Sequence, residues 1–287
     1  MLHQRRPLQG QLPHGDILLH AGDFSNTGTL AEVQAFLHWL QQQPHRLKIV
    51  IAGNHDVTLD AAFYDRQWSF HHTREDAAAA QALLTNPALA TTSRNNNSSS
   101  SVPDFYTSSS SSSSSSRSYS SGIVYLDNSG CVDAVTGLRF WGSPQTPEFC
   151  GWAFATADAA AAAQVWSRIP ADTDILLTHG PPAGVLDTNG SGSSCGCPQL
   201  SQALECVHPT LHVFGHIHES YGTAQLSTGT LAVNASTCDV RYRAIQPPLV
   251  VQMRLPGRPT AAAAAAGAAA GRQKPAVVGA SRSWRLQ

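Results

Sequence analysis

The sequence carries little net charge, and this limits the partners that it can attract over long distances. Its 18 Lys and Arg residues almost balance 19 Asp and Glu residues, so the formal net charge is -1. A chain without a basic field has no general attraction for the phosphate backbone of a nucleic acid. We therefore expect no binding to a nucleic-acid backbone.

Long apolar runs and dense cysteines are also missing. No run reaches the roughly 18 apolar residues that a membrane-spanning helix needs, so we expect no such helix and no association with a membrane. The opening stretch "MLHQRRPLQGQLPHGD" has arginines but no apolar segment behind them, unlike a secretory signal. Six cysteines in 287 residues are too few for a disulfide scaffold. We expect a cytoplasmic chain whose cysteines are thiols.

Two segments differ in composition from the rest of the chain. Residues 93–121 include nine consecutive serines, and residues 256–287 are rich in Ala, Gly and Pro. Neither segment has enough apolar side chains to offset the entropy lost on ordering. We predict one domain over residues 1–255, interrupted by an unstructured insertion at 93–121 and followed by an unstructured tail.

Short apolar runs bounded by turn residues alternate with helical patterns along the remaining sequence. Runs of this length that are rich in Ile, Val and Leu are typical of buried strands. The runs span residues 16–23, 47–56, 122–128, 137–144, 174–182, 211–218, 229–236 and 249–255. Amphipathic spacing predicts helices over residues 29–43 and 154–169. Strand, helix, strand order predicts an α/β fold with parallel strands covered by helices.

Several of the apolar runs end on side chains that can bind a metal ion. These side chains are Asp23, Asn54, His55, Asp56, His179, His216 and His218. A glycine directly precedes three of these polar ends, at Gly22, Gly53 and Gly215. In parallel sheets the ligand sites gather beyond the carboxyl ends of the strands. Any one of these residues alone could be an ordinary polar strand end, but their repetition predicts a shared site.

The donor types narrow the choice of metal. Asp and Asn oxygens together with imidazole nitrogens suit Mn, Fe, Zn or Ni better than ions that select thiolates. A carboxylate can also bridge two cations, which an imidazole cannot do. Two ions about 4 Å apart can stabilise the attacking and the leaving oxygen of an in-line displacement. These residue types therefore suit a centre of one or two divalent metal ions.

Four of these stretches resemble a known family. "GDFSNTG", "GNHD", "THGPP" and "FGHIH", in this order, look like the motifs of the calcineurin-like metallophosphoesterase superfamily. Longer stretches such as "LPHGDILLHAGDF" and "FWGSPQTPEFCGWAF" are similar to its metallophosphoesterase-domain-containing group. The resemblance covers about residues 3–255 apart from the serine-rich insertion. It implies a four-layer α/β/β/α sandwich around a binuclear metal site.

The resemblance also implies metal-binding roles for individual residues. It makes Asp23 the carboxylate that bridges both ions. Asn54, His179 and His216 would complete one metal, and His218 would bind the other.

Two adjacent residues, His55 and Asp56, take the expected catalytic roles. The resemblance makes His55 the family histidine near the phosphate, where it would protonate the leaving oxygen or stabilise the charged phosphorane-like state. A carboxylate beside it, that of Asp56, could orient the ring and raise its pKa. A helix N-cap is the alternative role for Asp56.

The start of the chain departs from the family pattern. The first strand of the family ends in Asp-x-His, whereas this chain begins Met1-Leu2-His3. His3 stands at about the right distance before Asp23 to be that metal-binding histidine, and Met1 stands where the aspartate belongs. Either the sequence is truncated within its first strand, or this chain lacks the strand and one metal site is incomplete. A mobile terminal histidine is the other interpretation of His3.

The predicted function is metal-dependent hydrolysis of a small phosphoester, most simply a phosphodiester, by a metal-bound hydroxide. A phosphoprotein phosphatase is less favoured, because the stretch Gly22–Gly28 lacks the arginine of the "GDxVDRG" motif. The other alternative is a catalytically impaired binding or scaffold protein with the same fold.

Two further stretches have weaker signals. The aromatic residues of the 140–154 stretch, which include Phe149 and Trp152, could stack on a base or an aryl group, although core packing is the commoner role. The C-x-C pair at Cys195 and Cys197 lacks a second pair at zinc-finger spacing, and we expect a structural role in a loop.

Overall fold

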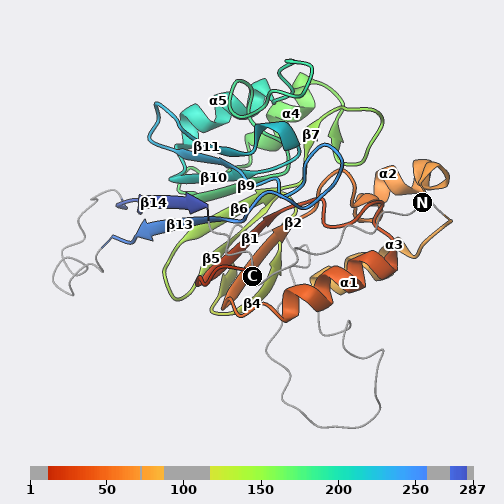
Figure 1. Cartoon of the computed structure of the whole chain (residues 1–287), viewed down its shortest axis with the longest axis horizontal. Coiled ribbons are helices and arrows are strands. Elements are labelled where there is room, and N and C mark those ends of the chain that lie inside the picture. The colour runs from red at the N-terminus through yellow and green to blue at the C-terminus, as the bar shows by residue number, and fades with distance from the viewer. Residues whose placement is uncertain (1–11, 72, 87–116, 257–271, 283–287) are drawn as a thin grey trace, which may run out of the picture.

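Two β-sheets face each other, and helices cover the outer face of each sheet (Figure 1). The computed structural model describes residues 12–71, 73–86, 117–256 and 272–282. Four layers follow one another in the order helix, sheet, sheet, helix, as the packing clusters between them show. The predicted α/β/β/α sandwich is confirmed.

The smaller sheet has the strand order β1-β2-β4, with both pairs parallel. Its strands are β1 (Ile17–Ala21), β2 (Leu47–Ile51) and β4 (Gly122–Tyr125). The connections between them hold helices α1 (Leu30–Gln41), α2 (Ala61–Gln67) and α3 (Ala77–Thr85), with short 3-10 turns η1 (Val57–Leu59) and η2 (Trp68–Phe70). Parallel neighbours need long crossover connections of this kind, because the chain must return to the starting edge before the next strand begins.

The larger sheet has seven strands in the order β11-β12-β10-β9-β6-β5-β3. They are β3 (Arg117–Tyr119), β5 (Ser129–Asp133), β6 (Arg139–Ser143), β9 (Ile175–Thr178), β10 (Leu211–Phe214), β11 (Gly222–Gln225) and β12 (Leu231–Asn234). Helices α4 (Ala159–Trp166) and α5 (Pro198–Val207) cover its outer face, and η4 spans His218–Ser220. Two short pairs complete the fold, β7 (Thr146–Pro147) with β8 (Ala155–Thr156), and β13 (Leu249–Arg254) with β14 (Ala276–Arg282).

Side chains that alternate along each strand build two different interfaces. On β2, Ile49 points into the core between the sheets, whereas its neighbour Val50 packs outward on helix α1. On β9, Leu177 faces the core and Leu176 packs outward against α5. Both faces of these strands are buried, which explains their continuous apolar sequences.

Two segments predicted to be unstructured contain strands, and for these residues the prediction is wrong. Residues Arg117–Tyr119 form β3, where the ring of Tyr119 is buried in the core between the sheets. Residues Ala276–Arg282 form β14, which pairs with β13 and packs Val277 against the same core. A partner strand already held on the domain supplies the hydrogen bonds that these polar segments need. The other residues of the two segments lie outside the described ranges.

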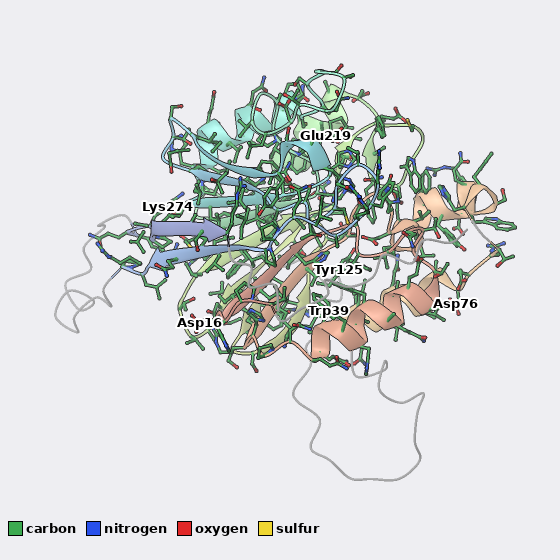
Figure 2. The ribbon with its side chains drawn as sticks, in the orientation of Figure 1. Asp16, Trp39, Asp76, Tyr125, Glu219 and Lys274 are labelled. Carbon is green, nitrogen blue, oxygen red and sulfur yellow. The ribbon has the colours of Figure 1, made fainter. Side chains whose placement is uncertain are left out.

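Charged residues tie the strand β14 to the domain. Arg272 donates from both terminal nitrogens to the carboxylate of Asp174, at 2.8 and 2.6 Å, and the Asp174 side chain is fully buried. Lys274, labelled in Figure 2, donates to the carbonyl oxygens of Val207 and His208 at the end of α5. These contacts hold the start of the β14 segment to the larger sheet and its helix.

Strand β1 lies at one edge of the smaller sheet as the described residues form it. The strand predicted to precede it, and the truncation that would account for its loss, therefore stay predictions. No helix in the described ranges is long and apolar enough to cross a membrane.

We expect the substitution Arg272→Ala to lower the free energy of unfolding by about 2 to 3 kcal/mol, because it leaves the buried carboxylate of Asp174 without its charged partner. Denaturant unfolding followed by circular dichroism measures the change. Arg168→Ala is the matched control, since Arg168 is exposed and forms no ion pair with another residue of the described ranges. Equal stability of both variants would contradict the anchoring role of Arg272.

Candidate metal centre

Asp23 lies on the turn directly after β1, in a backbone conformation that is costly for a side chain. Its φ angle is 57°, and Gly22 before it has a φ of 91°. The facing turn after β2 approaches so closely that a Cβ on Gly53 would lie 2.4 Å from Asp23 Oδ1 and 2.5 Å from His179 Cε1. Two glycines therefore permit the close approach of the two turns, and strained backbone of this kind is typical of functional sites.

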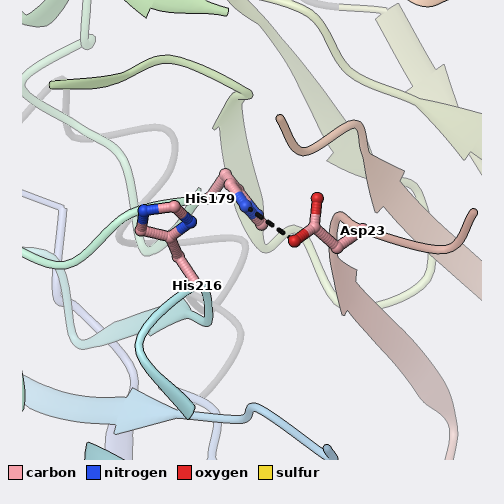
Figure 3. Close-up of side chains that lie close together, drawn as sticks. All are labelled: Asp23, His179 and His216. Atoms are coloured by element: carbon pink, nitrogen blue, oxygen red, sulfur yellow. Dashed lines mark ion pairs between the residues drawn. The ribbon is translucent and has the colours of Figure 1, made fainter. Parts of the chain in front are cut away.

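His179 follows β9 and brings a ring nitrogen to the carboxylate. Its Nδ1 donates to the carbonyl oxygen of Ala21, at 2.8 Å, which directs Nε2 toward the centre. Nε2 lies 3.3 Å from Asp23 Oδ2, the pair drawn in Figure 3, and 2.9 Å from Asn54 Oδ1. Burial disfavours the charged ring, but the nearby carboxylate of Asp23 outweighs it and raises the pKa of His179.

His216 completes the group from the turn after β10. It too has a left-handed backbone, with φ at 67°, and its ring lies 5.0 Å from the His179 ring between centroids. Burial lowers the pKa of His216 to about 3, so its imidazole is neutral at physiological pH. Among the described residues, no hydrogen bond reaches this ring. A half-buried neutral imidazole without a hydrogen-bond partner among the described residues is suited to bind a cation.

The donor atoms of Asp23, His179 and His216 all lie within 4.8 Å of one another (Figure 3). Asn54 adds its amide oxygen beside His179. Carboxylate and amide oxygens with two imidazoles suit a borderline divalent ion. These residues therefore fit a metal, and they are the set that the sequence predicted for one ion.

The remaining two predicted ligands stand apart from this group. His218 Nδ1 donates to the carbonyl oxygen of Asp239, at 3.0 Å, and its ring packs edge-on against Tyr242. His3 lies outside the described residues. The structure thus brings together ligands for one ion, and a second ion stays a prediction.

Asp56 does not hold the His55 ring as predicted. Its carboxylate accepts hydrogen bonds from the backbone nitrogens of Asp23, Ser25 and Gly53, at 2.8 to 3.0 Å, and from Ser25 Oγ at 2.5 Å. It does not cap the following 3-10 turn with its side chain either. The side chains of adjacent residues diverge here, so the buried Asp56 clamps the turn after β1 to the turn after β2. Burial and the charge of Asp23 raise the pKa of Asp56, and its hydrogen bonds oppose this rise.

His55 is held by other groups. Its backbone nitrogen donates to Asp23 Oδ1 at 2.9 Å, which places the residue beside the metal-binding carboxylate. Its ring Nδ1 donates to the carbonyl oxygen of Asn26 at 2.8 Å. The Trp152 ring packs against the imidazole with 4.2 Å between centroids, and Tyr242 lies edge-on at 5.9 Å. A backbone carbonyl and aromatic rings therefore fix the orientation of His55.

Comparison with known proteins assigns this arrangement to a family. The sequence model for the calcineurin-like phosphoesterases matches residues 3–220, which include every candidate metal ligand described above. The chain belongs to the calcineurin-like phosphoesterase family. The chain is 37% identical over 248 residues to metallophosphoesterase domain-containing protein 1 of Homo sapiens and of Mus musculus, covering 86% of this chain and 67% of theirs. It is also 31% identical over 229 residues to a UPF0046 protein of Caenorhabditis elegans, covering 79% and 64% of the two chains.

As a calcineurin-like phosphoesterase, the chain is a metal-dependent phosphoester hydrolase in its general class. The predicted resemblance is confirmed. The Asp23, His179 and His216 group lies at the carboxyl ends of β1, β9 and β10, the edge at which parallel sheets gather their ligand sites.

Sequence reasoning missed two residues that shape this phosphoesterase site. Asn26 acts through its backbone carbonyl, so its side-chain type carried no signal, although its place three residues after Asp23 could have drawn attention. Tyr242 lies in a loop without hydrophobic periodicity. Trp152, by contrast, was considered as a stacking residue, and the structure places its ring on His55. Phe149 was considered with it, and its 56% exposed side chain lies edge-on to His216 at 6.2 Å.

All six cysteines lie in the described residues, and each is a free thiol. Cys197 is buried before α5, where its sulfur accepts a hydrogen bond from the Trp166 indole. Cys195 belongs to no metal-binding group of the described residues. The expected structural role of this loop agrees with these contacts.

Proposed function

We propose that this chain hydrolyses phosphodiesters of modest size at a divalent-metal centre. The observation that carries the proposal is the convergence of Asp23, His179 and His216, joined by Asn54, on one small volume. A Mn, Fe, Zn or Ni ion bound there would supply positive charge for the phosphoryl oxygens and lower the pKa of a nearby water.

His55 assists the leaving group in this proposal. The ring belongs to a residue whose backbone is bonded to Asp23, so the imidazole stands at the edge of the metal centre. Nδ1 is committed to the carbonyl of Asn26, and Nε2 on the opposite edge of the ring is the nitrogen that donates to the leaving oxygen. The rings of Trp152 and Tyr242 beside it favour a substrate with a planar group on the phosphoester.

We extend the proposal to a second ion at His218. A carbonyl oxygen fixes Nδ1 of His218, as another carbonyl fixes Nδ1 of His179, and in both cases Nε2 is directed elsewhere. Metal-bound histidines commonly donate their other ring nitrogen in this way. His218 lies outside the compact group of described ligands, and the rival function is a binding protein with one ion and impaired catalysis.

Metal removal and reloading tests the proposal. Protein stripped with a chelator and then loaded with Mn is expected to hydrolyse bis(p-nitrophenyl) phosphate, while the stripped protein does not. Elemental analysis of the loaded protein counts the ions, and two per chain supports the binuclear centre. One ion without hydrolysis would favour the binding protein, and no ion with no hydrolysis would refute the metal centre itself.

A further inference from the structure

The carbonyl group that orients His55 belongs to the loop between β1 and α1, in which Asp56 holds Ser25 and Glu32 holds Asn26. Asn26, which supplies the carbonyl oxygen, lies between β1 and α1. The Glu32 carboxylate accepts from the backbone nitrogen of Asn26 at 3.0 Å and from its side-chain amide at 2.9 Å. The position of the carbonyl therefore depends on a residue in the first turn of α1.

Glu32 makes more contacts than capping of the helix requires. The capping box itself needs only Thr29, whose backbone nitrogen and hydroxyl both donate to Glu32 Oε2 at 3.0 Å. The bonds to Asn26 and a bond at 3.4 Å from the backbone nitrogen of Thr27 are additional. Burial disfavours the charge on Glu32, but the donors of Asn26 and Thr29 outweigh it and lower the pKa of the Glu32 carboxyl group.

One peptide group connects the carboxylate to the imidazole. The carbonyl of Asn26 and the N–H of Thr27 belong to the same planar peptide unit, and in a trans peptide they point in opposite directions. The N–H end of this unit donates to Glu32, and the C=O end accepts from His55. A charged acceptor at one end also polarises the peptide and strengthens the hydrogen bond at the other end.

We propose that Glu32 is a positioning residue for His55, acting through the peptide group between Asn26 and Thr27. The proposal rests on the proposed role of His55 in leaving-group assistance. Glu32 touches neither the substrate nor the metal ligands in this scheme. It keeps the imidazole in one orientation, and misplacement by about 1 Å can cost a catalytic group up to roughly 100-fold in rate.

The experiment compares two phosphodiesters that differ in their leaving groups. Bis(p-nitrophenyl) phosphate loses a good leaving group that needs little protonation, whereas diphenyl phosphate loses a poor one that needs it. Loss of leaving-group assistance should therefore lower kcat more for diphenyl phosphate. His55→Ala sets the reference pattern for this selective loss.

We expect Glu32→Ala to lower kcat selectively for diphenyl phosphate, as His55→Ala does, but by a smaller factor. The kcat for diphenyl phosphate should fall about 10-fold or more, that for bis(p-nitrophenyl) phosphate less than about 3-fold, and KM should change little. Glu32→Gln keeps one acceptor oxygen and should recover part of the loss.

The matched control is Asp76→Ala. Asp76 caps helix α3 by accepting from the Ala79 nitrogen at 2.9 Å, and it does not contact Asn26. Its loss weakens a helix N-terminus by about 1 kcal/mol, as loss of the cap at Glu32 does, without touching the loop of His55. Its kcat should therefore fall equally little for both substrates.

Equal losses on both substrates in Glu32→Ala, or losses no larger than those of Asp76→Ala, would overturn the positioning role while His55 kept its function. A His55→Ala variant without leaving-group selectivity would overturn the role of His55 and this proposal together. The two failures are therefore distinguishable in one set of measurements.

Discussion

Replacing Asp23 with alanine is expected to lower kcat/KM by about 1,000-fold or more and to remove metal from the protein. Asp23 is the only carboxylate in the compact group of described ligands, and it lies within 3.3 Å of His179. Its loss takes the negative charge from the centre, and the stabilisation that a bound ion gives the transition state is worth several kcal/mol. His216→Ala should have a comparable effect, since its neutral ring offers a nitrogen that needs no deprotonation.

Elemental analysis and hydrolysis of bis(p-nitrophenyl) phosphate, measured on the same protein, check this expectation. Cys195→Ala is the control, because its thiol lies in a loop outside the group of ligands. It should retain its metal content and its activity. Equal loss in all three variants would show that the assigned ligands are wrong.

Substitution of Asp56 by asparagine, which replaces one carboxylate oxygen by an NH₂ group, is expected to lower the stability of the fold. Asp56 Oδ1 accepts from the backbone and hydroxyl of Ser25, and Oδ2 accepts from the backbone nitrogens of Asp23 and Gly53. An asparagine NH₂ group in place of either carboxylate oxygen would point at these N–H and O–H donors and would find no acceptor. Since an unsatisfied buried donor costs about 1 to 3 kcal/mol, we expect a loss of about 3 kcal/mol in unfolding free energy.

The same substitution should weaken metal binding, because Asp56 fixes the two turns that carry Asp23 and Asn54 relative to each other. Calorimetric titration with Mn is expected to show an affinity about 10- to 100-fold lower than that of the unaltered chain. Asp127→Asn is the matched control, since Asp127 follows β4 and its carboxylate accepts from Asn128 outside the centre. Unchanged stability and metal affinity in Asp56→Asn would refute the clamp.

Much of the fold could be predicted because the strands are buried on both faces. Each of the eight apolar runs contains a strand, since a strand such as β2 must be apolar at Ile49 for the core and at Val50 for the helix layer. Helix α3 was missed because its sequence, AAAAQALLT, has little contrast between its faces. Strand β14 was missed because an edge strand needs apolar residues on one face only, and its order comes from pairing with β13.

The candidate metal ligands could be predicted because each follows a strand, and the carboxyl ends of parallel strands meet at one edge of the sheet. The role of Asp56 could not be predicted, since adjacent positions in sequence do not determine where two side chains point. The orientation of His55 depends on the backbone of Asn26 and the ring of Trp152, which reach it from distant parts of the chain. Such contacts depend on tertiary structure and leave no local pattern.

The left-handed backbone at Asp23 and His216 sets stability against function at the metal centre. Each such residue costs about 1 to 3 kcal/mol relative to a relaxed conformation, and glycine would adopt these φ angles without that cost. A chain selected for thermal stability alone would therefore gain by glycine at both positions, and it would lose its ligands by the same changes. If Asp23 and His216 bind the metal as proposed, the strained side chains at these two turns mean that the domain gives up part of its folding free energy to hold its ligands in place before any ion binds.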